Sequence, residues 1–180
     1  MKDAIQRKKH SGVIVVVTTG CLFALVVVLA IANKGYVAQR MEAQSEGYFS
    51  VVAGEQSYQV TLEDIEALNP VVIGANYKAS GFAAESRHYR GVCFKALTEY
   101  LSIDTSPYKQ AVFSAADGYM SALGIDEALD RDNCFIVTGD GAGTALGTLE
   151  SGGDGPFMMI LPRAPFSQRW CKYLLEVKLQ

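Results

Sequence analysis

The chain has 180 residues, a formal net charge of −3 and 49% hydrophobic residues, which suffices for one domain with a buried core and a short additional segment. Several basic side chains stand before residue 10, so the remainder of the chain is more acidic than the total indicates. Because nonspecific nucleic-acid binding requires a basic face, this composition excludes nucleic acid as an expected partner.

An uncharged apolar run extends from Val13 to Ala32, after a basic tail at residues 1–12. A helix of this length crosses a hydrocarbon core about 30 Å thick, and positive charge stays on the cytoplasmic side. We therefore predict a single-pass signal anchor in the cell membrane, with residues 1–12 cytoplasmic and the C-terminal domain outside. Two alternatives stay open: cleavage near Ala32, which would give a secreted domain, and a lipoprotein signal at Cys21.

Residues 33–47 are polar and are predicted to form a linker before a domain at residues 48–180. The first elements of this domain are two strands of a hairpin, Tyr48–Ala53 and Ser57–Val60, separated by a turn. Thr61 stands three residues before Asp64, a spacing typical of a helix N-cap, and the predicted helix Leu62–Leu68 ends before a proline.

The middle of the domain continues with a strand at Val71–Tyr77 and a loop at Gly81–Arg87. Cys93–Leu101 carries apolar residues at helical spacing, and Ala111–Ser114 reads as a strand. The Asp117-Gly118 pair that follows this strand is a strong turn signal, because glycine accepts a positive φ without steric cost.

The last part of the chain begins with a helical turn at Ile125–Leu129 and a strand at Cys134–Val137. The apolar run Pro156–Leu161 is predicted to be a central strand, and Leu174–Leu179 a closing strand after a bend at Arg169–Lys172. Strands outnumber helices and do not alternate regularly with them, which indicates an α+β domain that is mainly β.

A glycine-rich segment, Gly139–Gly143, follows a predicted strand and is a candidate phosphate loop. A dinucleotide-binding loop leads directly into a helix, and a P-loop contains Gly-Lys-Ser/Thr; the sequence here has neither feature. We therefore predict a hairpin at this segment.

Three cysteines lie beyond the apolar run: Cys93, Cys134 and Cys171. They are about 40 residues apart, so they form no CxxC zinc or redox signature. An exported chain could pair two of them in a disulfide, but we favour buried thiols, since Cys93 and Cys134 each stand beside phenylalanine in apolar runs.

Two groups of residues are candidate binding sites. The first is a small cationic cluster of Arg87, His88 and Arg90. It could bind an anion through charge-assisted hydrogen bonds, or it could simply be a solvated edge without a ligand. Asp117-Gly118-Tyr119 could orient and wall a ligand, or else form a hairpin turn with a packed tyrosine.

The order of several short segments resembles the molybdopterin-binding oxidoreductase domain of the sulfite oxidase class. The matching segments, over about residues 57–180, are Val60–Ile65, Tyr89–Leu97, Ser114–Tyr119, Ile125–Leu129, Gly155–Pro162 and Arg169–Lys172. The resemblance implies a small sulfite oxidase-like molybdopterin-binding domain, here preceded by one transmembrane helix. It also implies a pterin-phosphate site, for which Arg87, His88, Arg163 and Lys172 are the available cations.

One departure from that family bears on catalysis. Its catalytic members bind molybdenum through a cysteine thiolate placed before the segment that corresponds to Tyr89–Leu97, whereas this chain has no cysteine between Pro70 and Arg90. Cys93 falls where the family usually has proline. We therefore predict no metal site, and a module that binds a pterin such as molybdopterin, another small molecule or a protein partner. The expected cofactor-binding residues are Arg87, His88, Asp117, Gly118, Tyr119 and Lys172.

Two other functions stay open. The first is a molybdopterin-dependent oxidoreductase whose metal is held unconventionally through Cys93. The second is a purely structural component of the cell envelope.

Overall fold

The computed structural model describes residues 18–29, 45–78, 81 and 83–180. The chain divides into two units, Met1–Gln39 and Arg40–Gln180. In the first unit the described residues, 18–29, form a helix with exposed apolar side chains. Of the helices described, none combines the length and the hydropathy needed to cross a membrane. The predicted anchor also includes residues 13–17 and 30–32, which lie outside the described residues, as do the basic tail and residues 33–44 of the linker.

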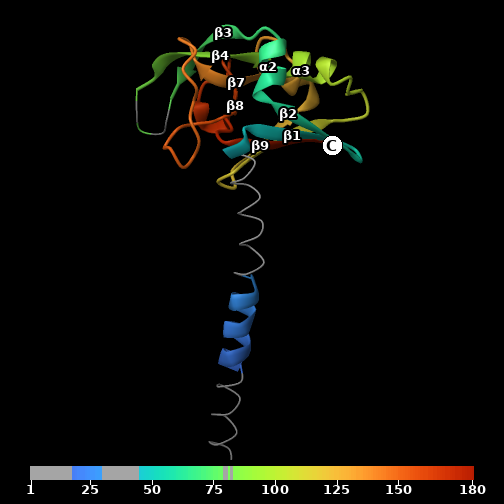
Figure 1. Cartoon of the computed structure of the whole chain (residues 1–180), viewed down its shortest axis with the longest axis vertical. Coiled ribbons are helices and arrows are strands. Elements are labelled where there is room, and N and C mark those ends of the chain that lie inside the picture. The colour runs from blue at the N-terminus through green and yellow to red at the C-terminus, as the bar shows by residue number, and fades with distance from the viewer. Residues whose placement is uncertain (1–17, 30–44, 79–80, 82) are drawn as a thin grey trace, which may run out of the picture. The chain divides into compact units, whose positions relative to one another are not determined.

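The second unit contains two β-sheets and a few short helices (Figure 1). Its elements in chain order are β1 (Tyr48–Ala53), β2 (Gln56–Thr61), α2 (Leu62–Ala67), β3 (Val71–Tyr77), β4 (Glu85–Cys93), α3 (Phe94–Tyr100), β5 (Gln110–Ala115), β6 (Met120–Gly124), α4 (Ile125–Ala128), β7 (Phe135–Asp140), β8 (Met158–Ile160), the 3₁₀ turn η1 (Ser167–Arg169) and β9 (Leu174–Leu179). The expected α+β class, with mainly β structure, is confirmed.

The two sheets form separate layers of the domain (Figure 1). The five-stranded sheet has the order β2-β1-β9-β5-β6, in which β1 and β9 are parallel and the other neighbours antiparallel. The four-stranded sheet, β3-β4-β7-β8, is antiparallel throughout. The C-terminal strand β9 therefore lies at the centre of its sheet and joins the N-terminal hairpin to the β5–β6 hairpin.

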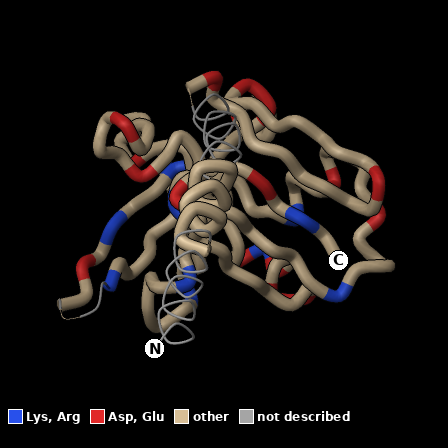
Figure 2. Tube along the Cα trace, turned by 90° about the horizontal axis from the view of Figure 1, so that it is seen from below, with Lys and Arg blue, Asp and Glu red and all other residues tan. Residues whose placement is uncertain are grey.

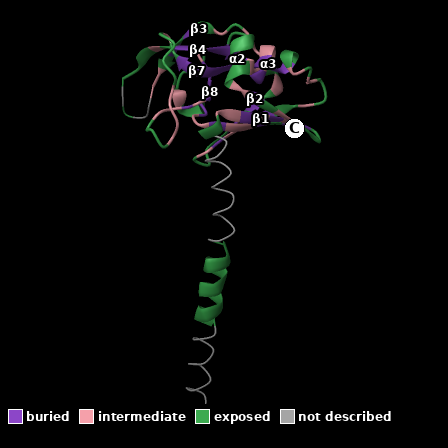
Figure 3. Cartoon of the chain, viewed as in Figure 1, coloured by how far each residue is buried: buried purple, intermediate pink, exposed green. Residues whose placement is uncertain are grey.

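The core lies between the layers, and many residues of the strands on either side of it are buried (Figure 3). Along β1 every second residue is buried, as expected when one face of a strand packs inward. Phe49 of β1 packs edge-on against Phe157, which precedes β8 in the other sheet, with ring centroids 4.9 Å apart. Phe94 of α3 contacts Phe113 of β5 in the same way at 5.3 Å. Aromatic pairs of this kind add to the stabilisation that burial provides.

Local signals in the sequence predicted several details correctly. Thr61 caps α2 through a capping box with Asp64, in which each side chain bonds the other residue's backbone N–H. Gly118 has a φ of 91° in the turn between β5 and β6, the conformation for which glycine was expected. Cys134 and Cys171 are buried free thiols, and Cys93 is a half-buried one.

The prediction that Pro156–Leu161 forms a central strand is wrong in one respect. The strand is shorter, Met158–Ile160, and β8 lies at the edge of its sheet. Its free side forms an isolated bridge between Met159 and Cys171, with both backbone hydrogen bonds present at 2.8 and 2.9 Å. The residues are apolar because they are buried on both faces, and burial does not require a central position.

The predicted loop at Gly81–Arg87 is also corrected. Strand β4 begins at Glu85, so Arg87 and His88 lie within a strand that pairs with both β3 and β7. Its first residues are polar because the start of the strand is solvent-exposed, while its second half is mostly buried. The polar composition was therefore mistaken for a loop.

Candidate functional site

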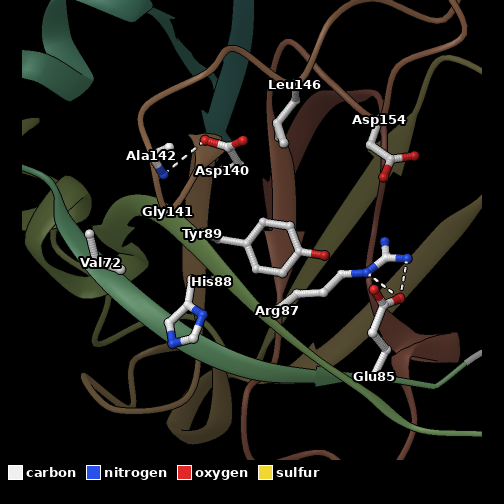
Figure 4. A pocket seen from close by; sticks show the side chains of 10 residues that line it. All are labelled: Val72, Glu85, Arg87, His88, Tyr89, Asp140, Gly141, Ala142, Leu146 and Asp154. Atoms are coloured by element: carbon white, nitrogen blue, oxygen red, sulfur yellow. Dashed lines mark hydrogen bonds and ion pairs between the residues drawn. The ribbon is translucent and has the colours of Figure 1, made fainter.

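A cleft of about 780 Å³ lies over the first half of β4 (Figure 4). Its polar lining comes from three places in the sequence: from β4 itself, from the end of β7, and from the segment before β8. These polar side chains are Glu85, Arg87, His88, Tyr89, Asp140 and Asp154. Val72 and Leu146 add apolar surface. The antiparallel register of β4 and β7 brings two of these side chains together, because Tyr89 stands directly opposite Asp140.

Tyr89 has a buried hydroxyl group that makes no hydrogen bond within the part of the chain that the structure describes. The residue is 4% exposed, and its ring packs edge-on against Trp170 with centroids 5.7 Å apart. Burial raises the pKa of this phenol, and the Arg87 guanidinium beside it, through its N–H groups and its charge, opposes that shift. An unpaired buried hydroxyl costs about 1–3 kcal/mol, so its presence at the wall of a cleft requires an explanation.

Arg87 is held in place from two sides. Its Nε and Nη2 atoms donate to the Glu85 carboxylate at 2.9 and 2.6 Å, and its guanidinium lies 4.0 Å from the centroid of the Tyr77 ring. The Glu85 carboxylate raises the pKa of Arg87, so this side chain stays charged. Figure 4 shows the guanidinium beside the hydroxyl end of Tyr89.

Lys172 also lies near the Tyr77 ring. Its Nζ atom is 5.3 Å from the Tyr77 centroid and 2.8 Å from Oδ1 of Asp154, in a half-buried ion pair. Burial opposes the charge on Lys172, but Asp154 outweighs this effect, and the pKa of the amine is raised. Both cations near the cleft therefore already have a carboxylate partner.

Asp140 ends β7 and organises the glycine-rich segment after it. Its Oδ1 atom accepts hydrogen bonds from the backbone N–H groups of Ala142 and Thr144, at 2.9 and 2.8 Å. These bonds, chiefly the one from Thr144, lower the pKa of the carboxyl group. A backbone bond from Asp140 N–H to the Thr144 carbonyl at 2.9 Å closes the turn, as the predicted hairpin requires.

Gly141 explains why this turn needs glycine beside β4. Its N–H donates to the His88 carbonyl at 2.8 Å, and a Cβ at this position would come within 2.6 Å of the His88 Cβ. The main chain of the turn therefore lies directly against β4, and no helix follows it in residues 141–157, which are all described. The segment therefore forms the predicted hairpin, in which Gly139 and Ala145 make an antiparallel bridge.

The structure separates the predicted site residues into two groups. Arg87 and His88 line the cleft, and Lys172 reaches its border through Asp154. The others, Asp117, Gly118 and Tyr119, form the turn between β5 and β6 in the other sheet. The Asp117 carboxylate accepts the Tyr119 N–H at 2.9 Å, and the Tyr119 hydroxyl donates to the Gln168 carbonyl. These three residues are not part of the cleft lining, and their predicted role in cofactor binding stays a prediction.

The remaining candidates lie elsewhere. Arg163 forms exposed ion pairs with Asp130 and Asp132. Cys93 caps α3, where its sulfur accepts the Ala96 N–H at 3.4 Å. At about 3.3 Å per residue, Cys93 stands about 13 Å along β4 from Tyr89, too far to ligate a metal bound beside that tyrosine. In the described residues, no group of three His, Cys, Asp or Glu side chains has a geometry that could hold a metal ion.

Four polar residues of the cleft lining were not identified as site residues from the sequence. Glu85 was only part of a predicted loop, Tyr89 only part of the family-like segment, Asp140 only part of a turn, and Asp154 was not noted. Asp140 carried a usable signal, since it is the polar last residue of a buried strand and precedes glycine. The unpaired state of the Tyr89 hydroxyl has no counterpart in the sequence, because it depends on what the fold places around it.

Figure 2 shows basic and acidic positions interspersed along the domain. The cleft follows the same pattern, with Glu85, Asp140 and Asp154 against Arg87 in its lining and Lys172 at its border. Carboxylates therefore outnumber cations at this site.

Comparison with known proteins gives a relationship at the level of fold. No family model matches the chain, and no curated protein matches it significantly. Among solved structures, the sulfane dehydrogenase SoxCD of Paracoccus pantotrophus is similar with a TM-score of 0.61 and 14% sequence identity. The match covers 76% of this chain and 38% of that one. At this level of identity the likeness shows a fold shared with part of that protein.

Proposed function

We propose that residues 45–180 form a binding module that holds a small polar molecule in the cleft beside β4, without conventional molybdenum catalysis. The observation that carries this proposal is the buried Tyr89 hydroxyl at the wall of a cleft with charged groups around it, since this hydroxyl has no hydrogen-bond partner in the described part of the chain. A bound molecule that supplied a donor or an acceptor would remove the cost of this group. The apolar surfaces of Val72 and Leu146 would hold the less polar part of the molecule.

Molybdopterin is the cofactor that the family resemblance implies, and the residues present meet its requirements only in part. Arg87 and Lys172 are positively charged, but each is engaged with a carboxylate. None of the described residues that line the cleft is a cysteine, the side chain that ligates the metal in catalytic members of that family. We therefore assign no metal-dependent step to this cleft.

A molybdopterin-dependent oxidoreductase is the second candidate function. The likeness to a sulfane dehydrogenase favours it at the level of fold, and its metal ligand would have to be Cys93. This side chain is half-buried and engaged as the N-cap of α3, so metal binding there would release the cap and open the start of the helix.

We further propose that the module is tethered to the cell membrane with the domain outside. This proposal is supported by the sequence of Val13–Ala32 and the basic residues before it. Membrane fractionation of cells that express the full chain, with alkaline carbonate extraction, would distinguish an anchored protein from a secreted one.

The ligand proposal is tested on protein purified from its native host. Native mass spectrometry of the unaltered chain should show a co-purified small molecule at up to one per chain, while metal analysis finds no stoichiometric molybdenum. Tyr89→Phe, which removes only the hydroxyl, should lower the bound fraction. The matched control is Tyr100→Phe, since the Tyr100 hydroxyl bonds Asp64 on α2, outside the cleft lining.

Two results would contradict the proposal. Molybdenum near one per chain, lost in Cys93→Ser, would establish the oxidoreductase instead. A chain without any co-purified molecule, and with no saturable binding from a small-molecule library, would leave a protein partner or a structural role as the function.

A further inference from the structure

We propose that the cleft beside β4 selects a ligand with a positively charged nitrogen, an ammonium or guanidinium group, that pairs with Asp140 and hydrogen-bonds to Tyr89. This inference rests on the proposed function and specifies the chemical class of the ligand. It departs from the pterin-phosphate expectation, because a phosphate needs uncompensated positive charge.

Asp140 is the charged group of the cleft lining that lacks an ion-pair partner among the described residues. Its Oδ1 atom accepts two backbone hydrogen bonds, and the carboxylate also interacts with the Thr144 side chain and the Gly143 N–H, which are uncharged groups. The same bonds fix the carboxylate in position at the end of β7, and a fixed group loses little conformational freedom when it binds a ligand.

The other charges of the cleft cancel in pairs. Arg87 bonds Glu85, and Lys172 bonds Asp154 at 2.8 Å. A bound phosphate would have to displace these carboxylates from their cations and would also face the negative charge of Asp140. A cationic ligand needs no such displacement. Asp140, the lining charge without an ion-pair partner among the described residues, is negative and would attract it.

Tyr89 supplies the second contact. It is the cross-strand partner of Asp140, and Figure 4 shows the carboxylate on one side of the Tyr89 ring and the hydroxyl at the other end. A ligand paired with the carboxylate would therefore have to extend along the ring to reach the hydroxyl. A guanidinium carries five N–H donors in a planar fork, so it can donate to the carboxylate and leave a donor for the phenol oxygen.

The test compares three probes on the unaltered full chain labelled with ¹⁵N. Butylguanidine carries the charge, butylurea has nearly the same shape without it, and inorganic phosphate has the opposite charge. We expect butylguanidine to shift the backbone amide signals of Gly141 and Ala142 saturably. Butylurea should bind roughly tenfold more weakly, as expected for loss of a charge-assisted hydrogen bond, and phosphate should not shift these signals.

Matched variants locate the effect. Asp140→Asn keeps an oxygen that can accept the two backbone N–H groups but removes the charge, and it should weaken butylguanidine binding roughly tenfold. The control is Asp104→Asn, because Asp104 also accepts a backbone N–H, from Ser106 at 3.0 Å, in a loop outside the cleft lining. Tyr89→Phe should weaken binding by a smaller factor, and Asp104→Asn should leave it unchanged.

The outcomes separate this inference from the proposed function. Saturable binding of phosphate at these amides without binding of butylguanidine would overturn the cationic class and leave a ligand-binding cleft. Equal affinities for butylguanidine and butylurea would do the same. If no probe shifts these signals and no small molecule co-purifies with the chain, both the inference and the proposed function fail.

Discussion

Tyr89 keeps a hydroxyl group at a position where phenylalanine could make the same ring contacts. The ring packs against Trp170, and the oxygen has no hydrogen-bond partner among the described residues. A group that lowers stability and makes no compensating contact is commonly retained for function, because binding sites are optimised for the bound state.

The first prediction follows from this cost. Without a ligand, Tyr89→Phe should raise the free energy of unfolding by about 1 kcal/mol, since it removes an unpaired buried polar atom and preserves the packing. Urea unfolding of the wild type and the variant measures the difference. A loss of stability larger than about 1 kcal/mol would mean that the hydroxyl has a partner and is not free for a ligand.

Cys171 provides a second prediction at this scale. Its thiol is buried, and burial raises its pKa from 9.0 to about 12. Because the folded state holds this proton more tightly than the unfolded state, the thiol's contribution to stability is complete below about pH 9. It is lost as the pH rises towards 12.

Urea unfolding at about pH 8 and about pH 10.5 tests this linkage. The wild type should lose stability between the two conditions, and Cys171→Ala should lose less, because alanine has no proton to release. Parallel losses in both proteins would show that Cys171 does not contribute to the alkaline transition.

Strand β4 is the element that connects the fold to the candidate site. It pairs with β3 on one side and β7 on the other, and its register shifts between Arg90 and Gly91. Before the shift, Arg87, His88 and Tyr89 form the floor of the cleft; after it, Val92 packs in the core. An irregularity of this kind redirects side chains, so one strand can serve both regions.

Gly91 makes the close approach of β4 and β7 possible, which gives a third prediction. A Cβ at this position would lie 2.2 Å from the Ile136 carbonyl oxygen and 2.6 Å from the Val137 Cα, both backbone atoms. Gly91→Ala should therefore lower the free energy of unfolding by more than about 3 kcal/mol, or prevent folding.

Gly124→Ala is the matched control for this change, because no atom lies within 4 Å of a Cβ built there. Circular dichroism and thermal unfolding compare the two variants. A Gly91→Ala protein as stable as the Gly124→Ala protein would mean that the two strands are farther apart than the structure has them.

At the scale of the whole molecule, the C-terminal strand holds the five-stranded sheet together. Strand β9 lies between β1 and β5, and its buried residues Leu174, Val177 and Leu179 face the core. Removal of this strand leaves two hairpins without their shared neighbour, and an isolated hairpin is only marginally stable in water.

The fourth prediction compares two truncations. A fragment of residues 45–180 should unfold in one cooperative transition, because the unit from Arg40 onward has its own core. The same fragment without residues 174–180 should lose that transition. Differential scanning calorimetry measures both, and a cooperative transition in the shorter fragment would show that β9 is dispensable.

Much of the fold could be read from local patterns. Three such features were predicted correctly: the Thr61 cap, the Asp117-Gly118 turn and the alternating burial along β1. Each depends on residues close together in the sequence, so the local sequence is enough to predict it. The edge position of β8 could not be read in this way, because a buried edge strand and a central strand have the same apolar composition.

The sequence alone determined the class of fold, most of the strands and two of the residues that line the cleft, Arg87 and His88. The tertiary structure decided the character of the site. It gave Arg87 and Lys172 carboxylate partners. Among the residues described, it left Asp140 without a cationic partner and the buried Tyr89 hydroxyl without a hydrogen bond. Charge balance and hydrogen bonding depend on side chains that are distant in the sequence and adjacent in space. The order of neighbouring residues in the sequence therefore predicts the strands. The charge balance and hydrogen bonding of the cleft are decided only when the sheets assemble.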